Sequence, residues 1–334
     1  MRNRRTWIAR TAIATAFLAA LAWMATAQTG VPAGHWYKGN LHTHTINSDG
    51  DTSPDDVVRW YKEHRYDFLS LTAHNFLTET GGLSGVFGAK GKFLLLPGEE
   101  VTSRYSGKPI HINALDVRSL IEPATGTSVV DTIQQNVDRI HAANSLASLN
   151  HPNFGWAITT DELRQVNGLK LFEVYNGHPT VNNQGGGGQP GLEEMWDSLL
   201  TAGRRIHGIA VDDAHHFKTL GQGYSNPGRG WVMVKAAELS VATVRAALEN
   251  GDFYASTGVV LEDAERLPNG LRLRLPQTGT TRFTTQFIGA NGEVLATSID
   301  AAPEYRLKAG QPYVRAVVTD SNGWQAWVQP VFAD

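Results

Sequence analysis

The sequence of 334 residues contains no cysteine. Disulfide bonds are therefore excluded as a source of stability, and a thiol nucleophile is excluded as a catalytic group. Any metal ion held by this chain must be bound by histidine, aspartate or glutamate side chains, because no thiolate ligand exists.

Charged residues are few, at 18% of the chain, and no low-complexity tract is long enough to suggest disorder. The hydrophobic content of 41% suffices for a conventional core, and the length exceeds that of one typical domain. The composition predicts a globular protein with one large domain and room for a small companion.

An excess of basic residues is also lacking. The chain has 29 lysines and arginines against 32 acidic residues, and four of the arginines lie in the first 27 residues. Without that segment 25 basic residues face 32 acidic ones, which is a balance of −7. A groove for a nucleic-acid backbone normally carries basic charge, so nucleic acid is not an expected partner.

The first 27 residues have the pattern of a signal peptide. Four arginines precede an apolar run from Thr11 to Thr26, and Ala25-Thr26-Ala27 fits a small-residue cleavage site. We therefore expect an exported protein, either periplasmic or secreted. The apolar run is slightly shorter than the ~20 residues of a spanning helix, so no stable membrane insertion is expected after cleavage. An uncleaved anchor is the alternative, and Arg4-Arg5 leaves the twin-arginine route open.

From about residue 35 to residue 258, short apolar runs alternate with amphipathic stretches, as in a strand-helix barrel or a doubly wound sheet. Strands are predicted at Trp36 to Leu41, Phe68 to Thr72, Phe93 to Leu96, Ile110 to Leu115, Leu146 to Leu149, Leu171 to Val174, Ile206 to Val211 and Trp231 to Lys235. Helices are predicted at Pro54 to His64, Val129 to Ala143, Leu192 to Ala202 and Val241 to Asn250. The first helix carries Ser53 at its N-cap and a proline at its first position.

Residues 259–334 have a different sequence pattern. Alternating segments such as Leu271 to Leu275 and Tyr313 to Val318 are separated by Asn-Gly turns at Asn269, Asn291 and Asn322. This pattern predicts a small all-β sandwich. The segment contains no histidine, so a structural or positioning role is expected for it.

Potential metal ligands lie at or just after the predicted strand ends. His42 and His44 follow the first strand, and the others follow later ones: His74, Glu99, Glu100, His151, Asp213 and His215. In a strand-helix barrel, loops from consecutive strands converge at this face. Each residue alone is ambiguous, but their joint appearance after successive strands predicts a metal site.

Five other histidines are interpreted as solvated, helical or structural residues: His64, His141, His178, His207 and His216. Among these, His178 and His216 are the two expected near the site.

The same residues form an ordered set of motifs: Asn40-Leu41-His42-Thr43-His44-Thr45, Ser48-Asp49-Gly50, Leu71-Thr72-Ala73-His74-Asn75, Gly98-Glu99-Glu100-Val101, His111, Asn150-His151-Pro152 and Asp213-Ala214-His215. This set resembles the polymerase and histidinol phosphatase (PHP) family over residues 35–258. The β-rich tail, ending in Gln329-Pro330-Val331-Phe332, and the signal segment are similar to the exported branch of that family.

The resemblance implies an α/β fold, a distorted (β/α)7 TIM-like barrel with the small C-terminal β-sandwich, and two or three divalent ions of zinc, manganese or iron. It implies that one ion is held by His42, His44, Glu100 and Asp213. Glu100 would bridge to a second ion held by His111 and His151, and a third ion would be held by Asp49, His74 and His215. The family motif Gly-x-Glu favours Glu100 over Glu99, which then faces away.

One residue departs from the family pattern: Ala73 stands where the family often has an aspartate before His74. That loss could weaken occupancy of the third site. Glu173, in a strand that resembles one of the family, supports the ligands, meets the substrate or forms a simple salt bridge.

The expected function is metal-dependent hydrolysis of a small-molecule ester, most simply a phosphoester. His42, His44, Glu100 and Asp213 are the predicted catalytic centre, with Arg104, or Lys108, neutralising phosphate oxygens. A carboxylic or carbamate ester is the alternative substrate, and a non-catalytic metal-containing binding protein is the alternative class. The oligomeric state cannot be predicted from the sequence.

Overall fold

The computed structural model describes residues 34–88, 91–277 and 279–333. The predicted signal peptide at residues 1–27 lies outside the described residues. From His35 onward the chain forms one compact unit, and the boundary proposed near residue 258 stays a prediction. Within the described part, no helix has the length and apolar character needed to cross a membrane.

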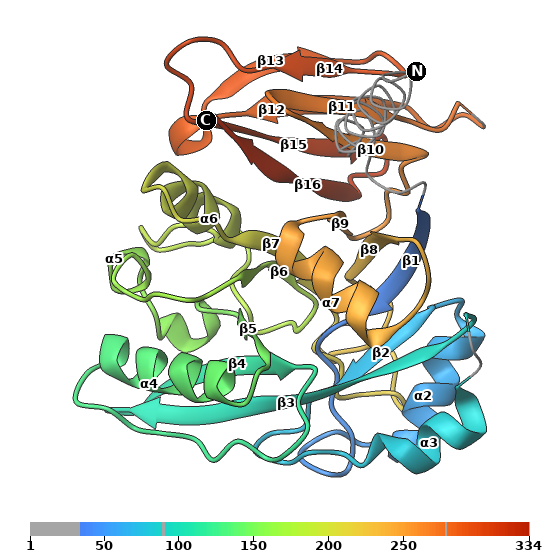
Figure 1. The fold of residues 1–334 in the computed structure, drawn as a ribbon, viewed down its shortest axis with the longest axis vertical. Helices are drawn as coiled ribbons and strands as arrows, with labels where there is room; N and C mark the ends of the chain where they lie inside the picture. Colours follow the sequence, from blue (N-terminus) through green and yellow to red (C-terminus); the bar gives the residue numbers. More distant parts are fainter. Residues whose placement is uncertain (1–33, 89–90, 278, 334) are drawn as a thin grey trace, which may run out of the picture. The chain divides into compact units, whose positions relative to one another are not determined.

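Eight strands build the sheet that carries the candidate site (Figure 1). They are β1 (His35–Asn40), β2 (Phe68–Leu71), β3 (Leu94–Tyr105), β4 (Lys108–Leu115), β5 (Leu146–Leu149), β6 (Leu171–Asn176), β7 (His207–Val211) and β8 (Trp231–Ala236). Their order in the sheet is β8-β1-β2-β3-β4-β5-β6-β7. The pairs β1-β2, β2-β3, β5-β6 and β6-β7 are parallel. The expected mixed α/β architecture is thereby confirmed.

The four longer helices form where the sequence predicts them. They are α2 (Pro54–Glu63), α4 (Val129–Ala142), α6 (Leu192–Thr201) and α7 (Val241–Asn250). Ser53 stands at the N-cap of α2, although its side chain makes no capping hydrogen bond. Ser128 and Ser240 cap α4 and α7, because their hydroxyls accept hydrogen bonds from the third backbone N–H of each helix. Two short helices were not predicted, α3 (Thr80–Phe87) and α5 (Thr160–Leu163). Three of the eight residues of α3 are glycine, which disfavours a helix in isolation.

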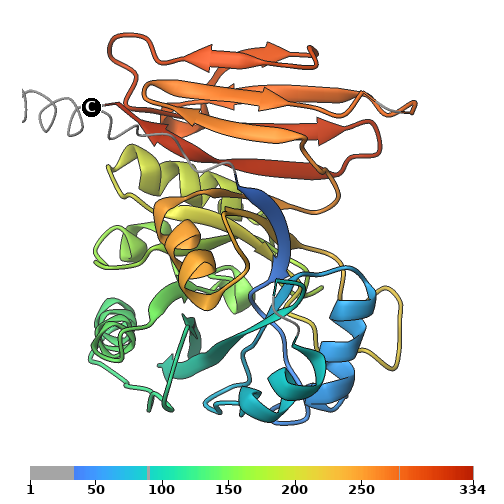
Figure 2. The same ribbon diagram turned by 45° about the vertical axis from the view of Figure 1, so that its right-hand side comes forward.

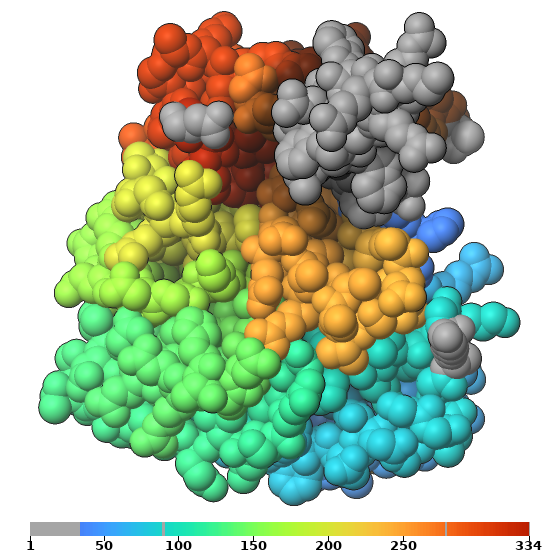
Figure 3. Space-filling view, viewed as in Figure 1, coloured from blue at the N-terminus to red at the C-terminus, as the bar shows by residue number. Residues whose placement is uncertain are grey.

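The sheet is curled around an apolar interior. Side chains from seven of the eight strands, and Leu41 directly after β1, meet in one buried cluster that contains Leu41, Phe68, Leu96, Leu115, Leu146, Leu171, Ile209 and Val232. Val244, Ala247 and Leu248 of α7 pack into the same cluster. The side chains of α7, in orange, cover the middle of the face seen in Figure 3. The interior is therefore a packed core covered by α7.

The described residues do not form a uniform seven-fold strand-helix repeat. Strands β3 and β4 make an antiparallel hairpin with no helix between them, and β8 runs antiparallel to β1. Among the described strands, β7 forms no ladder with β8. The hairpin arises because residues after Leu96 continue as a strand and turn back at Ser106 and Gly107, both with positive φ.

The C-terminal strands continue the large sheet and add a second layer (Figure 2). Strand β9 (Phe253–Ser256) pairs with β16 (Gln325–Phe332), which extends through β15 (Tyr313–Asp320), β12 (Phe283–Ile288) and β13 (Val294–Ser298). A separate sheet contains β10 (Asp263–Leu267), β11 (Gly270–Arg274) and β14 (Glu304–Arg306). All these pairs are antiparallel, and the three predicted Asn-Gly turns lie between consecutive strands.

A buried ion pair joins the C-terminal strands to α6. Arg315 of β15 lies with both Nε and Nη2 at 2.6 Å from the carboxylate oxygens of Asp197. Arg315 is fully buried and Asp197 is nearly so. Because an isolated buried charge is costly, the two side chains depend on one another.

Candidate metal centre

The predicted ligands gather where the strands of the curled sheet end. His42 and His44 follow β1, His74 follows β2, His151 follows β5, and Asp213 and His215 follow β7. Isolated parallel bridges link Thr43 to Ala214 and His74 to Glu100, so loops distant in sequence lie side by side. The structure brings all nine predicted ligand residues together.

Glu100 and His111 reach the cluster from a hairpin rather than from strand ends. Glu100 lies within the 12-residue strand β3, and His111 lies in β4 opposite Thr102. Residues two apart on a strand share a face, so Glu100 and the pair formed by Thr102 and His111 project to the same side. The expectation that Glu100 follows a strand end is therefore wrong, although its side chain does reach the cluster.

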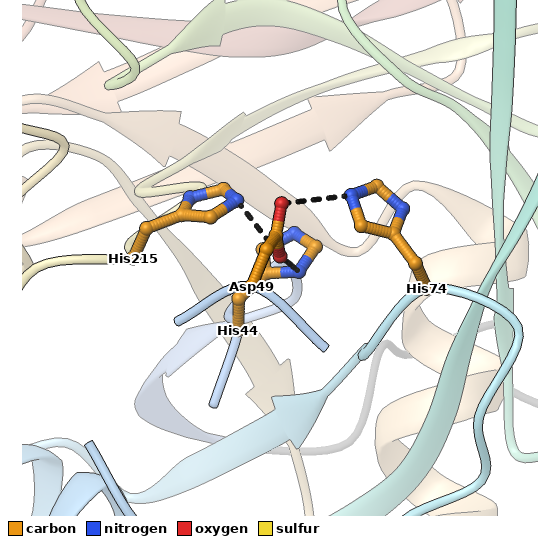
Figure 4. Close-up of side chains that lie close together, drawn as sticks. All are labelled: His44, Asp49, His74 and His215. Atoms are coloured by element: carbon orange, nitrogen blue, oxygen red, sulfur yellow. Dashed lines mark ion pairs between the residues drawn. The ribbon is translucent and has the colours of Figure 1, made fainter. Parts of the chain in front are cut away.

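Asp49 lies between three imidazole rings (Figure 4). Its Oδ1 is 3.2 Å from Nδ1 of His44 and 3.4 Å from Nε2 of His215. Its Oδ2 is 3.4 Å from Nε2 of His74. The Asp49 side chain is 53% exposed, so this group of four residues faces solvent. The loop closes tightly beside it, since a Cβ on Gly50 would lie 2.7 Å from the backbone nitrogen of Thr45.

Deeper in the molecule, three overlapping groups of side chains also have the spacing of metal ligands. They are His42 with His44 and Glu100; His42 with His151 and Asp213; and His74 with Glu100 and His111. Nε2 of His42 is 3.4 Å from Oε2 of Glu100 and 3.3 Å from Oδ1 of Asp213. Glu100 belongs to two of the groups, so its carboxylate can serve two ions.

The donor atoms of this cluster fit divalent cations. Oε2 of Glu100, Nδ1 of His111 and Oδ1 of Asp213 are buried without a hydrogen-bond partner among the described residues. Such groups normally find a partner, and a metal ion is one. Nε2 of His42 and Nε2 of His44 are 3.1 Å apart, which falls within the about 2.9 to 3.4 Å expected between neighbouring nitrogen ligands of zinc.

The carboxylates of the cluster raise the pKa of four of its rings, those of His42, His44, His74 and His151, against the opposing effect of burial. Burial opposes charging of His42, but the carboxylates of Asp213 and Glu100 raise its pKa to about 10. Burial likewise opposes ionisation of Glu100, yet the surrounding histidines hold its pKa well below the usual range. The same balance lowers the pKa of Asp213. Divalent ions would supply the positive charge that these buried carboxylates attract.

The whole described structure can be compared with known ones. It resembles the structure of a two-domain protein from Bacteroides vulgatus containing a predicted PHP-like metal-dependent phosphoesterase, with a TM-score of 0.50 and 17% identity over 89% of this chain and 96% of that chain. The chain has a PHP-like fold. The resemblance found in the sequence motifs is therefore confirmed at the level of the fold.

Two further solved structures are similar over shorter stretches. One is an amidohydrolase from Chromobacterium violaceum, with a TM-score of 0.38 and 16% identity over 54% of this chain and 88% of that one. The other, from Bifidobacterium adolescentis, is assigned to the metal-dependent phosphoesterases, with a TM-score of 0.41 and 16% identity over 63% of this chain and 95% of that one. No family model matches the sequence, and no curated protein matches it.

Glu173 contacts two of the candidate ligand residues. Its Oε1 is 2.7 Å from Nδ1 of His42, and its Oε2 accepts hydrogen bonds from the His151 backbone and from Asn176. A carboxylate on Nδ1 leaves Nε2 of His42 directed at the cluster. These contacts match the supporting role among those predicted for Glu173.

Glu99 points out of the cluster into the protein. It is fully buried, and its Oε2 accepts a hydrogen bond of 2.9 Å from the Ile121 backbone. Burial raises its pKa to about 7, while the hydrogen bond opposes that rise. Adjacent residues on a strand point to opposite faces, which explains why Glu99 and Glu100 separate.

Arg104 does not join the cluster. It lies four residues beyond Glu100 along β3, about 13 Å of extended chain, and its exposed guanidinium donates to the carbonyl oxygen of Gly107. Lys108 lies near Glu162 instead. Both basic residues are close to Glu100 in sequence, but they lie near the turn of the β3-β4 hairpin, away from the Glu100 side chain. The predicted role of Arg104 beside the ions is corrected accordingly.

Two residues at the site were not predicted as functional, Phe154 and His178. Both line the same cavity as Asp49, His74, Glu100, His111, His151, Asp213 and His215. Phe154 begins η1 (Phe154–Trp156), three residues after His151. His178 follows the end of β6 by two residues, the same position that His42 and Asp213 hold after β1 and β7. This spacing was the available signal, but the predicted strand ended too early, at Val174.

Proposed function

We propose that this chain is an exported metal-dependent phosphoesterase that acts on small-molecule esters. The observation that carries the proposal is the buried cluster of histidines and carboxylates, in which three potential ligand atoms have no hydrogen-bond partner among the described residues. The PHP-like fold supports it, and the fold match in Bacteroides vulgatus is described as containing a predicted phosphoesterase. Export rests on the pattern of residues 1–27 alone.

The proposed centre holds two or three ions of zinc, manganese or iron. The buried positions are formed by His42, His44, Glu100, His111, His151 and Asp213, and the solvent-facing position by Asp49, His74 and His215 with His44. Divalent ions bound there would act as Lewis acids and lower the pKa of bound water from ~15.7 towards ~7. We further propose that the curled sheet is a distorted barrel of the TIM type and that residues 259–334 form a separate β-sandwich domain.

The residues of the chain have distinct parts in the proposed hydrolysis. Glu173 holds His42 in one orientation through Nδ1, and Asn150 holds Glu100 through a 2.8 Å hydrogen bond to Oε1. Asp213 follows β7 with a left-handed backbone, φ 49°, which turns its carboxylate into the cluster. Oriented ligands fix where the substrate's oxygen atoms bind, and this preorganisation accounts for most of the rate in such centres.

Hydrolysis of a carboxylic or carbamate ester at the same centre is the second candidate. One observation favours it: no lysine or arginine is among the described residues that line the cavity. Phosphate groups are commonly bound by such side chains, whereas a neutral ester does not need them. Phe154 gives the cavity an apolar wall that suits an uncharged substituent.

The test is a substrate panel on the purified chain after chelation and re-addition of zinc, manganese or iron. Nitrophenyl phosphate and bis-nitrophenyl phosphate are compared with nitrophenyl acetate and nitrophenyl carbamates. Metal-restored activity on the phosphates supports the proposal, and activity confined to the acyl esters supports the second candidate. Bound metal with no turnover on any ester would contradict both and favour a binding protein.

Export has a separate test. The chain is produced with its first 27 residues in a bacterial host, and the N-terminal sequence of the protein in the periplasm and medium is determined. A mature chain beginning at Gln28 supports export and cleavage after Ala27. Retention of the full chain inside the cell would contradict it.

A further inference from the structure

His178 lines the cavity of the metal centre without belonging to any of the four groups of metal-ligand spacing. The cavity has a volume of about 110 Å³, and all but two of its lining residues belong to those groups. The exceptions are Phe154 and His178. A substrate bound at the ions must therefore meet these two side chains.

Hydrogen bonds to Thr180 determine which nitrogen of His178 carries the proton. The backbone N–H of Thr180 donates to Nδ1 at 3.3 Å, and its hydroxyl lies 2.9 Å from the same atom. A backbone N–H can only donate, so Nδ1 is an acceptor and bears no proton. In the neutral ring the proton is then on Nε2, which becomes a hydrogen-bond donor.

The loop that carries His178 is tied to the metal centre. The backbone N–H of His178 donates to Oδ1 of Asn176 at 2.8 Å, and Nδ2 of Asn176 donates to Oδ2 of Asp213 at 3.1 Å. The Val181 backbone N–H donates to the carbonyl oxygen of His178. Asn176 thus links the loop of His178 to the carboxylate of Asp213.

The Nε2 edge of the His178 ring is the edge that its own loop leaves free, and the residue lines the cavity. Its Nδ1 edge is turned to its own loop, and its ring lies edge-to-face with His215, with 5.4 Å between ring centroids. Phe154 is its neighbour on another side, at 6.3 Å. Among the described residues, none accepts a hydrogen bond from Nε2 or forms an ion pair with it. A donor without a protein partner, on a residue that lines the cavity, is available to an acceptor that a ligand would bring.

We propose that His178 is a catalytic residue that donates its Nε2–H to a non-bridging oxygen of the substrate's phosphoryl group. This inference rests on the proposed phosphoesterase function. It also gives the cavity a hydrogen-bond donor for a phosphate oxygen, although no lysine or arginine is among the described residues that line it. A fixed neutral donor of this kind is worth most where negative charge increases in the transition state.

The test compares substitutions that keep or remove the donor. In His178→Gln the amide nitrogen can take the place of Nε2, whereas His178→Phe keeps a ring of similar shape without any donor. The matched control is His64→Phe, because His64 is an exposed ring stacked on Trp60 that belongs neither to the ligand groups nor to the residues lining the cavity. Each protein is loaded with metal, and its metal content is measured before kinetics.

The expected result is that kcat/KM for nitrophenyl phosphate falls about 10²- to 10³-fold in His178→Phe, the usual loss for one oxyanion donor. His178→Gln should recover part of that loss, and metal content should equal wild type in both. The inference would be overturned by wild-type kinetics in His178→Phe. It would also be overturned by loss of a metal ion in that variant, because His178 would then be a ligand.

Binding of inorganic phosphate separates this inference from the proposed function. Calorimetry on metal-loaded protein measures phosphate affinity whether or not any ester is hydrolysed. A wild type that hydrolyses no ester but binds phosphate tenfold more tightly than His178→Phe contradicts the proposed function and supports the donor role. Equal affinity in the two proteins, or no phosphate binding by wild type, overturns the donor role.

Discussion

Nδ1 of His42 and Oε1 of Glu173 lie 2.7 Å apart, and both side chains are fully buried. The second oxygen of Glu173 accepts two hydrogen bonds of 2.8 Å, from the His151 backbone and from Asn176. One carboxylate therefore positions residues that follow two strands, β1 and β5. This contact determines which nitrogen of His42 faces the centre.

Glu173→Gln is expected to lower metal affinity by about 10- to 100-fold, because an amide holds the His42 ring less strongly than a carboxylate. Competition with a chromophoric chelator measures the affinity. Glu265→Gln, at an exposed carboxylate on β10, is the control and should leave it unchanged. Wild-type metal affinity in Glu173→Gln would mean that the contact does not support the ligands.

The neighbours Glu99 and Glu100 offer a matched pair of substitutions. Both are buried, but the Glu100 carboxylate faces the ions' positions and the Glu99 carboxylate faces Ile121. Glu100→Gln should abolish metal-restored hydrolysis and lower the number of bound ions, whereas Glu99→Gln should keep both. Elemental analysis and kinetics on the two variants provide the check. An equal loss in both variants would count against the assignment of Glu100.

Asp49→Asn should remove one ion and leave the buried positions filled. Asp49 is the solvent-facing carboxylate among His44, His74 and His215, and it contacts none of the deeper acids. Elemental analysis is expected to show one equivalent fewer than wild type, with the unfolding temperature nearly unchanged. Loss of every ion would show that the positions fill only together.

Most strands and the longer helices could be predicted because their patterns are local. The apolar periodicity and the Ser240 cap that identify α7 at residues 241–250 depend on side chains a few positions apart. The length of β3 could not be predicted in the same way. Its second half, up to Tyr105, is polar, and pairing with β4 rather than apolar content keeps it extended.

The candidate site was predictable where ligands follow apolar strands, and less so elsewhere. His42 and His74 stand directly after such runs, so their convergence follows from the topology. Arg104 was misplaced because the hairpin turn lay beyond the predicted strand. His178 is expected near the site but not predicted as functional, because β6 continues to Asn176, through polar residues whose burial depends on contacts with the centre.

His207 should make stability depend on pH. Burial, followed by repulsion from Arg266 and Lys170, lowers its pKa to about 4 from the ordinary value of 6.5. Between these values the unfolded chain binds a proton that the folded chain does not, so the free energy of unfolding falls as pH drops through that window. The contribution of His207 to the free energy of unfolding is fully present above pH 6.5. About 3 kcal/mol of it is lost as the pH falls to about 4.

The measurement for His207 is urea unfolding at a series of pH values from 7.5 to about 4.5, on wild type and His207→Phe. The difference between the two proteins isolates this residue from the other titrating groups. The wild type should lose more stability than the variant as pH falls. Parallel curves would show that His207 is not the cause.

Arg315→Met should destabilise the fold by about 3 to 5 kcal/mol, because it leaves the buried Asp197 without its partner. Replacing Asp197 by leucine in the same chain should recover part of the loss, since no buried charge then remains. Denaturant unfolding of the single and double variants measures both effects. A single variant within 1 kcal/mol of wild type would contradict the assigned dependence.

The central claim is that His42, Glu100, Asp213 and the residues around them hold metal ions. The most direct test is the metal-to-protein ratio of the purified chain, measured by elemental analysis before and after chelation and after dialysis against zinc, manganese or iron. The account predicts two or three divalent ions per chain, removed by the chelator and restored on re-addition. Fewer than one ion per chain at saturating metal would contradict it.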